Sequence, residues 1–225
     1  MWCVPRIDAE YIERMEDVLR LYARPVDPLE PVVCLDERPV VLRSHVRAGQ
    51  LAAPGKPARV DYEYERCGTA NIFCIIEPKV GRRLTHATKN RTGPRYVGAL
   101  KKVARRYPHA RTIHLVQDNL NIHCKRTVIG VLGKQAGQAL WGRFTVHPTP
   151  MHASWLNAAE LEASLVAREC LGKRRIESLR TLRPEVTAWN RKADRERRAI
   201  NWKFRVADAR RVFRYDGIAT CRSKH

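Results

Sequence analysis

Two short apolar segments, each carrying an acid at its end, constrain most strongly what this chain can fold into. The segment "IHLVQD" (113–118) has five residues of buried-strand character followed by Asp118, and "VVCLDE" (32–37) is a shorter apolar strand that carries Asp36. A turn would explain each acid, since Asp and Asn are favoured where strands end. A metal ligand is the alternative, and the remaining sequence must discriminate between the two.

The charge of the chain favours a polyanionic partner. Its 225 residues include 43 Lys and Arg against 23 Asp and Glu, which gives a formal net charge of +20 and a sequence pI near 10.3. Such a field favours nucleic acid or an anionic membrane surface. No apolar run approaches the roughly 20 residues that span a bilayer. The start of the chain has acids where a signal peptide would be basic and then apolar. We therefore expect nucleic acid and no membrane partner.

The seven cysteines are scattered without any C-x-x-C spacing. An odd number of cysteines without metal-ligand spacing indicates reduced thiols in a cytosolic protein. We expect no zinc site, because zinc sites use paired cysteine or histidine ligands.

The order of the expected elements indicates an α/β domain. Parallel strands joined by crossovers need helices that cover the sheet. We predict helices over 8–22, 92–108, 125–141 and 157–170, strands over 32–37, 112–117 and 143–148, and a hairpin within 60–78 that turns near Gly68. The predicted domains are an N-terminal helix and linker (1–30), an α/β domain (31–172), and a basic helical extension with a tail (173–225).

The extension is strongly basic. Residues 173–214 hold fifteen Lys and Arg against five Asp and Glu, interleaved with Trp189, Trp202 and Phe204. Either this is a solvated helix packed by its aromatic residues, or it is a surface that contacts phosphates and releases counterions, and both descriptions can hold at once. The candidate DNA contacts in it are Arg191, Lys192, Arg195 and Arg198.

The two strand-end acids predict a metal site. Adjacent strands that stop at the same edge of a sheet bring their terminal side chains together, and two close carboxylates repel unless a cation lies between them. Carboxylate oxygens suit Mg²⁺ or Mn²⁺. Such a site near a polyanion implies phosphoryl transfer with two metal ions.

A third acid follows in the helix over 157–170. Glu160 and Glu162 point about 200° apart on a helix, so only one can face the sheet edge. Glu160 shares its face with small residues, which allow a close approach to the sheet. We therefore choose Glu160, and we expect Glu162 to face solvent.

The blocks "VVCLDE", "HLVQDNLNIH" and "HPTPMHASWLNAAELE" resemble the three signature blocks of DDE transposases of the mariner-like superfamily, in its bacterial insertion-sequence branch. The resemblance covers roughly residues 1–209. It implies an RNase H-like fold, with a mixed five-stranded sheet flanked by helices and an acid triad at one edge. By this resemblance Asp36, Asp118 and Glu160 are the catalytic residues and bind two Mg²⁺ or Mn²⁺ ions.

The resemblance also implies a reaction and its partners. Water activated by metal attacks a phosphodiester at the transposon end, and the resulting 3′-OH attacks target DNA by in-line displacement. The partners are double-stranded DNA (transposon ends and target) and a second copy of the chain on DNA. The location is the bacterial cytoplasm, in association with the nucleoid.

The remaining candidate DNA contacts flank the second and third acids: Asn119, Asn121, His123, His152 and Trp155. The two asparagines either form the turn or orient Asp118 and contact the DNA backbone. His123 is either a hydrogen-bonded structural histidine or a phosphate contact. Trp155 is either part of the core or a stacking platform for a base.

The sequence departs from the family at three places. Met151 replaces a lysine that is common in the bacterial branch. We expect no helix-turn-helix module for end recognition ahead of the first catalytic strand. The ending "RVFRYDGIATCRSKH" lacks the family pattern, as in a shifted reading frame or a disordered tail. Two alternatives therefore stay open: an inactive nucleic-acid-binding remnant, and a stand-alone RNase H-like endonuclease.

Overall fold

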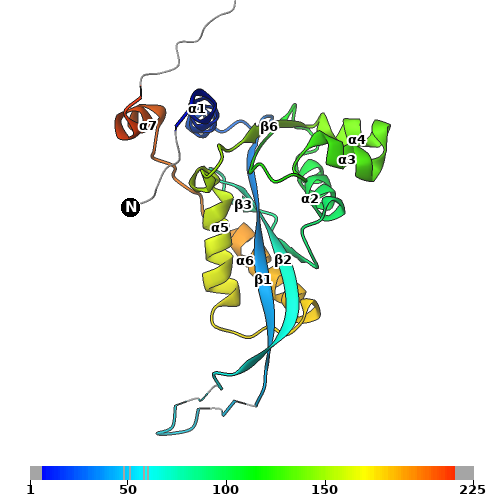
Figure 1. Ribbon diagram of the computed structural model, residues 1–225, viewed down its shortest axis with the longest axis vertical. Coiled ribbons are helices and arrows are strands. Elements are labelled where there is room, and N and C mark those ends of the chain that lie inside the picture. The colour runs from blue at the N-terminus through cyan, green and yellow to red at the C-terminus, as the bar shows by residue number, and fades with distance from the viewer. Residues whose placement is uncertain (1–6, 48, 51, 58, 60, 216–225) are drawn as a thin grey trace, which may run out of the picture.

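The chain folds around one mixed β-sheet (Figure 1). The computed structural model describes residues 7–47, 49–50, 52–57, 59 and 61–215. The strands are β1 (Val32–His45), β2 (Tyr64–Glu77), β3 (Arg82–Arg83), β4 (His86–Thr88), β5 (Ile113–Gln117) and β6 (Phe144–Pro148). The order is β3-β2-β1-β5-β6, and β4 also pairs with β2. Because β3 and β4 share one edge position, the sheet has five positions, and the predicted mixed five-stranded sheet is confirmed.

Helices cover both faces of the sheet (Figure 1). The α-helices are α1 (Ala9–Ala23), α2 (Gly93–Arg106), α3 (Lys125–Leu132), α4 (Lys134–Trp141), α5 (Ala159–Leu165), α6 (Leu179–Glu196) and α7 (Val206–Phe213). A 3₁₀ turn (Ser154–Leu156) precedes α5, and a π-helical turn (Val166–Leu171) follows it. None of the described helices is long and apolar enough to cross a membrane.

Strand alternation divides the core into two layers. Leu35 of β1 faces the layer that α2 and α3 cover, where it packs with Tyr96 and Val128. The neighbouring Cys34 faces the opposite layer, which contains residues of α1 and the start of α5. Because successive side chains of a strand point to opposite faces, neighbouring residues of β1 face different layers. The acid at position 36 therefore lies on the same face as Cys34.

The hairpin of the sheet is longer than the sequence predicts, and it lies elsewhere. β1 continues past Asp36 to His45, and β2 runs unbroken through Gly68. Gly68 does not form a turn: it pairs with Leu42 beside a β-bulge and has φ of +104°, a conformation that glycine tolerates. The expected hairpin within 60–78 is therefore wrong, and β1 and β2 form the hairpin instead (Figure 1).

Two predicted helices are interrupted. The helix expected over 125–141 divides at Gly133, whose φ of +81° ends α3 and begins α4. The two short helices then pack closely, since a Cβ on Gly137 would lie 2.6 Å from the Cα of Ile129. The helix expected over 157–170 begins as α5 and continues as the π-helical turn.

The basic extension packs back onto the sheet domain. Leu182, Val186 and Trp189 of α6 share a core cluster with Ile72 of β2 and Val166. Helix α6 is continuous through Pro184, so that proline does not end it. Further along, α7 lies beside α1 (Figure 1), where Arg210 pairs with Glu16 at 2.9 Å. The boundary between residues 172 and 173 stays a prediction, and most of the divergent ending (216–225) lies outside the described residues.

Candidate active site

Asp36 and Asp118 lie level with each other at the point where two parallel strands separate. The pairing of β1 with β5 ends at Cys34 opposite Val116. Asp36 and Asp118 each follow that last pair by two residues. Because the two strands are parallel, the two acids lie at the same distance along the strand direction from the last pair. Asp118 directly follows the end of β5, whereas Asp36 lies inside β1 and not at its end. The predicted strand end at Asp36 is therefore only the end of pairing with β5.

Buried hydrogen bonds fix the start of α5 against β1. The side-chain amide of Asn157 donates to the carbonyl of Leu35 at 2.9 Å, and its oxygen accepts from the N–H of Ala159 at 3.1 Å. On the other side, the hydroxyl of Tyr22 donates to the carbonyl of Leu156 at 2.8 Å. These bonds place Glu160, in the first turn of α5, beside Asp36.

Asn157 was missed as a site residue in the sequence. The residue is buried, with 2% of its surface exposed. A detectable signal was present, because asparagine ahead of the first turn of a helix is a favoured N-terminal cap.

The three acids interact electrostatically. The pKa of Asp36 is raised to about 7: burial is the largest cause, the N–H of Glu37 opposes it, and the charges of Glu160 and Asp118 add to it. An acid whose ionisation is opposed by two neighbouring carboxylates, as for Asp36, is in an arrangement that a bound cation stabilises.

The free oxygens of these acids fit hard divalent cations. Asp36 accepts the Glu37 N–H through Oδ1, and Asp118 accepts the Leu120 N–H through Oδ1. Among the described residues, no hydrogen bond engages the second oxygen of either aspartate or the carboxylate of Glu160. Each acid thus keeps at least one oxygen of the kind that Mg²⁺ and Mn²⁺ prefer.

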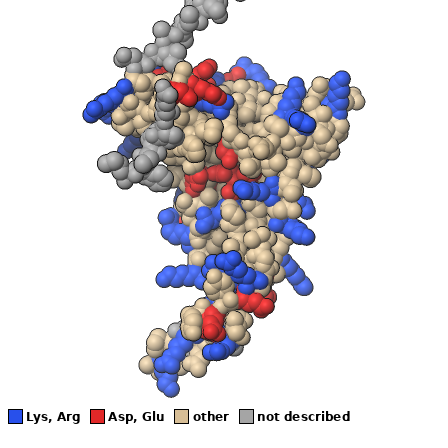
Figure 2. All heavy atoms as spheres, viewed as in Figure 1, with Lys and Arg blue, Asp and Glu red and all other residues tan. Residues whose placement is uncertain are grey.

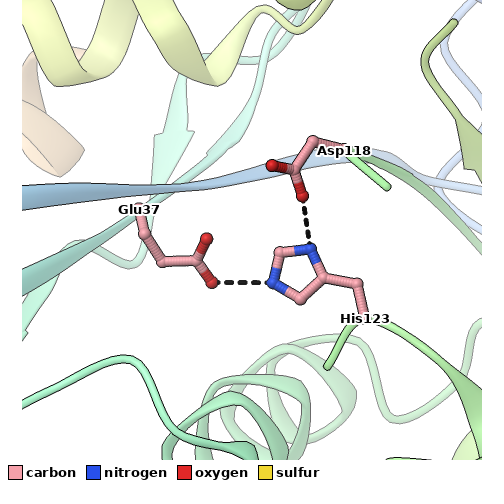
Figure 3. A group of neighbouring side chains, drawn as sticks. All are labelled: Glu37, Asp118 and His123. Carbon is pink, nitrogen blue, oxygen red and sulfur yellow. Dashed lines mark hydrogen bonds and ion pairs between the residues drawn. The ribbon is translucent and has the colours of Figure 1, made fainter. Parts of the chain in front are cut away.

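His123 contacts Asp118 from the face of the sheet to which Glu37 points, which is opposite to the face of Asp36 (Figure 3). Its Nε2 lies 2.8 Å from Oε1 of Glu37, and its Nδ1 lies 2.6 Å from Oδ1 of Asp118, an ion-pair contact of poorer angle than a hydrogen bond. Burial alone would lower the pKa of His123, but the two carboxylates outweigh it and raise that pKa to about 9. The ring is therefore a buried cation at neutral pH.

The same contacts affect Asp118. Burial would raise its pKa, but the contact with His123 outweighs burial and lowers that pKa. Glu37, Asp118 and His123 also have ligand atoms within 4.8 Å of one another. Both ring nitrogens already face carboxylates, however, so protonated His123 takes the place that a metal ion would occupy there. The contacts of His123 are those of the structural histidine that the sequence left open.

The other predicted residues around the triad lie at the surface. Asn119 accepts from Arg14 at 2.9 Å and donates to the carbonyl of Thr149 at 2.5 Å, so it connects α1 to the loop after β6. Asn121 is exposed. His152 is exposed with φ of +60° and lines a groove of about 510 Å³ with Arg14 and Asn119.

Trp155 is not a core residue. Its side chain is 39% exposed and meets the ring of Phe204 edge-on, with ring centroids 5.6 Å apart. The exposed part leaves room for base stacking, which stays a prediction.

The four basic candidates of the extension divide into two kinds. Arg191 and Arg195 are exposed and make no ion pair with any described residue, and Lys192 lies 3.8 Å from Glu196. Arg198, in contrast, makes two hydrogen bonds of 2.8 and 2.7 Å to Glu169. Its guanidinium is engaged within the protein.

Glu162 does not face solvent, and that expectation is wrong. Its carboxylate is fully buried and pairs with the equally buried guanidinium of Arg83 at 3.0 Å. Thr85 donates a further hydrogen bond at 3.3 Å. Protein therefore covers both sides of helix α5. Glu160 lies beside Asp36, and Glu162 forms a buried ion pair with Arg83.

The sequence pattern of the DDE superfamily endonucleases matches residues 31–183. This chain belongs to that family. The match includes all three acids and the strands and helix that carry them. A search among curated proteins finds no match.

The fold is that of the Mos1 mariner transposase, which is RNase H-like. The chain is 18% identical to the Mos1 mariner paired-end complex with Mn, with a TM-score of 0.56, 87% of this chain and 60% of that chain covered. The Mos1 strand transfer complex gives 18% identity, a TM-score of 0.56, and coverage of 88% and 58%. A pre-cleavage Mos1 transpososome gives 19% identity and a TM-score of 0.56, with 86% of this chain and 59% of that chain covered. The chain thus spans about three fifths of the length of these transposase chains.

Proposed function

We propose that this chain is the catalytic domain of a DDE transposase from a bacterial insertion sequence, and that it cleaves and joins DNA strands by metal-dependent phosphoryl transfer. One observation carries the proposal: Asp36 and Asp118 lie level at the separation of β1 and β5, and the charge of Glu160 acts on Asp36. Membership of the DDE superfamily endonucleases supports the reaction class.

In this proposal Asp36, Asp118 and Glu160 hold two Mg²⁺ or Mn²⁺ ions. Two such ions stabilise the attacking and the leaving oxygen of an in-line displacement. The protein's part is to orient the three carboxylates. Asn157 holds Glu160 against β1, and His123 holds one oxygen of Asp118.

Double-stranded DNA, both transposon end and target, is the proposed substrate. The net charge of +20 supports a polyanion, and the related Mos1 structures are a paired-end complex and a strand transfer complex. We place the chain in the bacterial branch because of the "SWLN" block and the spacing from Asp118 to Glu160. A dimer on DNA and association with the bacterial nucleoid belong to the same proposal.

The test is nicking of a labelled duplex in Mg²⁺ or Mn²⁺ by the native chain and by Asp118→Ala. We expect metal-dependent nicks with the native chain and none with the variant, at equal DNA binding. If both bind DNA and neither nicks it, the catalytic proposal fails, and the chain is an inactive DNA-binding remnant.

A second assay separates the transposase from a stand-alone endonuclease. A 3′-OH end carrying the transposon sequence is offered together with a target duplex. Joined products support strand transfer, whereas nicks without joining indicate a nuclease that uses water as its only nucleophile.

A further inference from the structure

A groove lined by arginines begins two residues beyond Asp36. It has a volume of about 200 Å³ and lies between β1 and the segment that follows the π-helical turn. Four arginines line it, namely Arg38, Arg43, Arg174 and Arg175. None of the described residues that line it is acidic. The groove therefore has a single sign of charge.

The free edge of β1 forms one wall. Beyond Cys34 this edge no longer pairs with β5, and at the far end the N–H of Arg43 donates to the carbonyl of Ile176 at 2.9 Å. Asp36 and Arg38 point to the same face of the strand, roughly 6.6 Å apart along it. The wall thus leads directly from the triad into the groove.

Two of the four arginines lack an ionic partner. Arg38 and Arg43 form no ion pair with any described residue, and the Nε atom of each is buried without a hydrogen-bond partner. The guanidinium of Arg43 rests on the ring of Tyr64, 4.4 Å from its centroid. A buried donor without an acceptor costs free energy, so these two arginines are suited to an external anion.

The other two arginines are held by the protein. Arg174 pairs with Glu185 at 3.0 Å, and Arg175 donates to the carbonyl of Glu63 at 2.6 Å. They fix the opposite wall and add to its positive potential. The free donors therefore lie on the β1 side of the groove.

We infer that this arginine groove binds the backbone phosphates of the DNA strand next to the phosphate at the triad. Arg38 and Arg43 lie five residues apart, roughly 17 Å along an extended strand. One DNA strand carries a phosphate about every 3.4 Å along the helix axis, so the two arginines reach different phosphates of the same strand. Lysine and arginine side chains border the central acidic hollow and continue below it along the long axis in Figure 2. The identity of the ligand rests on the proposed function.

The test compares a double variant with a control that removes the same charge elsewhere. Arg38→Gln with Arg43→Gln removes the two unpaired groove arginines. Arg105→Gln with Lys134→Gln removes two exposed charges that do not line the groove. Binding to a fluorescent 30-base-pair duplex is measured without divalent metal over a range of salt concentrations, so that cleavage does not enter.

We expect the groove variant to bind more weakly and to lower the slope of log K against log salt by about two, since each phosphate contact contributes about 0.9. The control should keep the native slope. Arg38→Lys with Arg43→Lys, which keeps both charges, should retain most of that slope, and thermal melts establish that each variant is folded.

Three outcomes separate this inference from the proposed function. An unchanged slope in a folded groove variant would overturn the inference, even where the native chain nicks DNA. An equal loss in the control would overturn it too, because the effect would then belong to net charge. A reduced slope in the groove variant alone supports the groove, even where no nicking is found.

Discussion

The Nδ1 atom of His123 lies 2.6 Å from Oδ1 of Asp118. The same ring reaches Glu37 through Nε2, so one buried imidazolium holds a carboxylate of the triad and a carboxylate of the core (Figure 3). The direction of the Asp118 side chain therefore depends on a residue that is itself buried. His123 is a positioning residue in the proposed site.

Replacing His123 should impair turnover more than DNA binding. His123→Ala releases Asp118, and loss of a group that orients a metal ligand typically costs 10- to 100-fold in activity or metal affinity. We expect a loss of about that size in nicking rate, with a higher metal concentration at half-maximal rate. The control Glu37→Gln keeps His123 against Asp118 and should lose far less. Equal losses in the two variants would show that the contacts of His123 with Asp118 and Glu37 act only through the stability of the fold.

Divalent metal should stabilise the folded chain through the three acids. A ligand that binds only the native state stabilises it by about 2.7 kcal/mol at a concentration of 100 Kd, which corresponds to several degrees in Tm for a chain of this size. We expect Mg²⁺ or Mn²⁺ to raise the Tm of the native chain and of Glu177→Gln, an exposed control. Asp36→Asn and Glu160→Gln should lose most of that rise. An undiminished rise in both would place the metal elsewhere.

The positions of the three acids at one edge of the sheet could be predicted because they depend on local pattern. The buried segment followed by Asp118 indicates the end of β5, and the acid in the first turn of α5 indicates the start of that helix. The length of β1 does not follow from such a pattern. The polar residues and Pro39 after Asp36 resemble the end of a strand, yet proline is tolerated where an edge is unpaired, and here β5 has already separated.

The error at Glu162 has a different cause. The helical-face argument placed two acids on opposite sides of α5, which is correct, but it assumed that only one side is covered. Arg83, which forms the other cover, is 79 residues away in sequence. No periodicity in α5 reports such a distant partner, so the ion pair could not be predicted.

The ion pair between Glu162 and Arg83 should contribute to the stability of the fold and not to the reaction. Glu162→Gln leaves the guanidinium of Arg83 buried without its counter-charge, and breaking a buried pair by removing one partner costs about 3 to 5 kcal/mol. We expect a large fall in the free energy of unfolding, measured by urea denaturation. Glu160→Gln should have little effect on stability in the same assay.

A double replacement tests whether charge is the cause. Arg83→Met with Glu162→Leu removes both charges, and replacing a buried pair with apolar residues is often neutral or stabilising. It should recover much of the stability that Glu162→Gln loses. A double variant as unstable as the single one would show that losing the hydrogen bonds from Arg83 to the carbonyls of Gly81 and Arg198 costs as much as the unpaired charge does.

The pair of Glu169 and Arg198 should make stability depend on acid pH. The hydrogen bonds from Arg198 lower the pKa of Glu169 from 4.5 to about 2. A carboxyl with a lowered folded-state pKa binds fewer protons in the native state, so its contribution is full above pH 4.5 and falls as pH decreases towards 2. The Tm difference between the native chain and Glu169→Gln should therefore shrink between pH 5.5 and 3.5. The corresponding difference for Glu177→Gln should stay constant, and a Glu169→Gln difference that also stays constant would contradict the assignment.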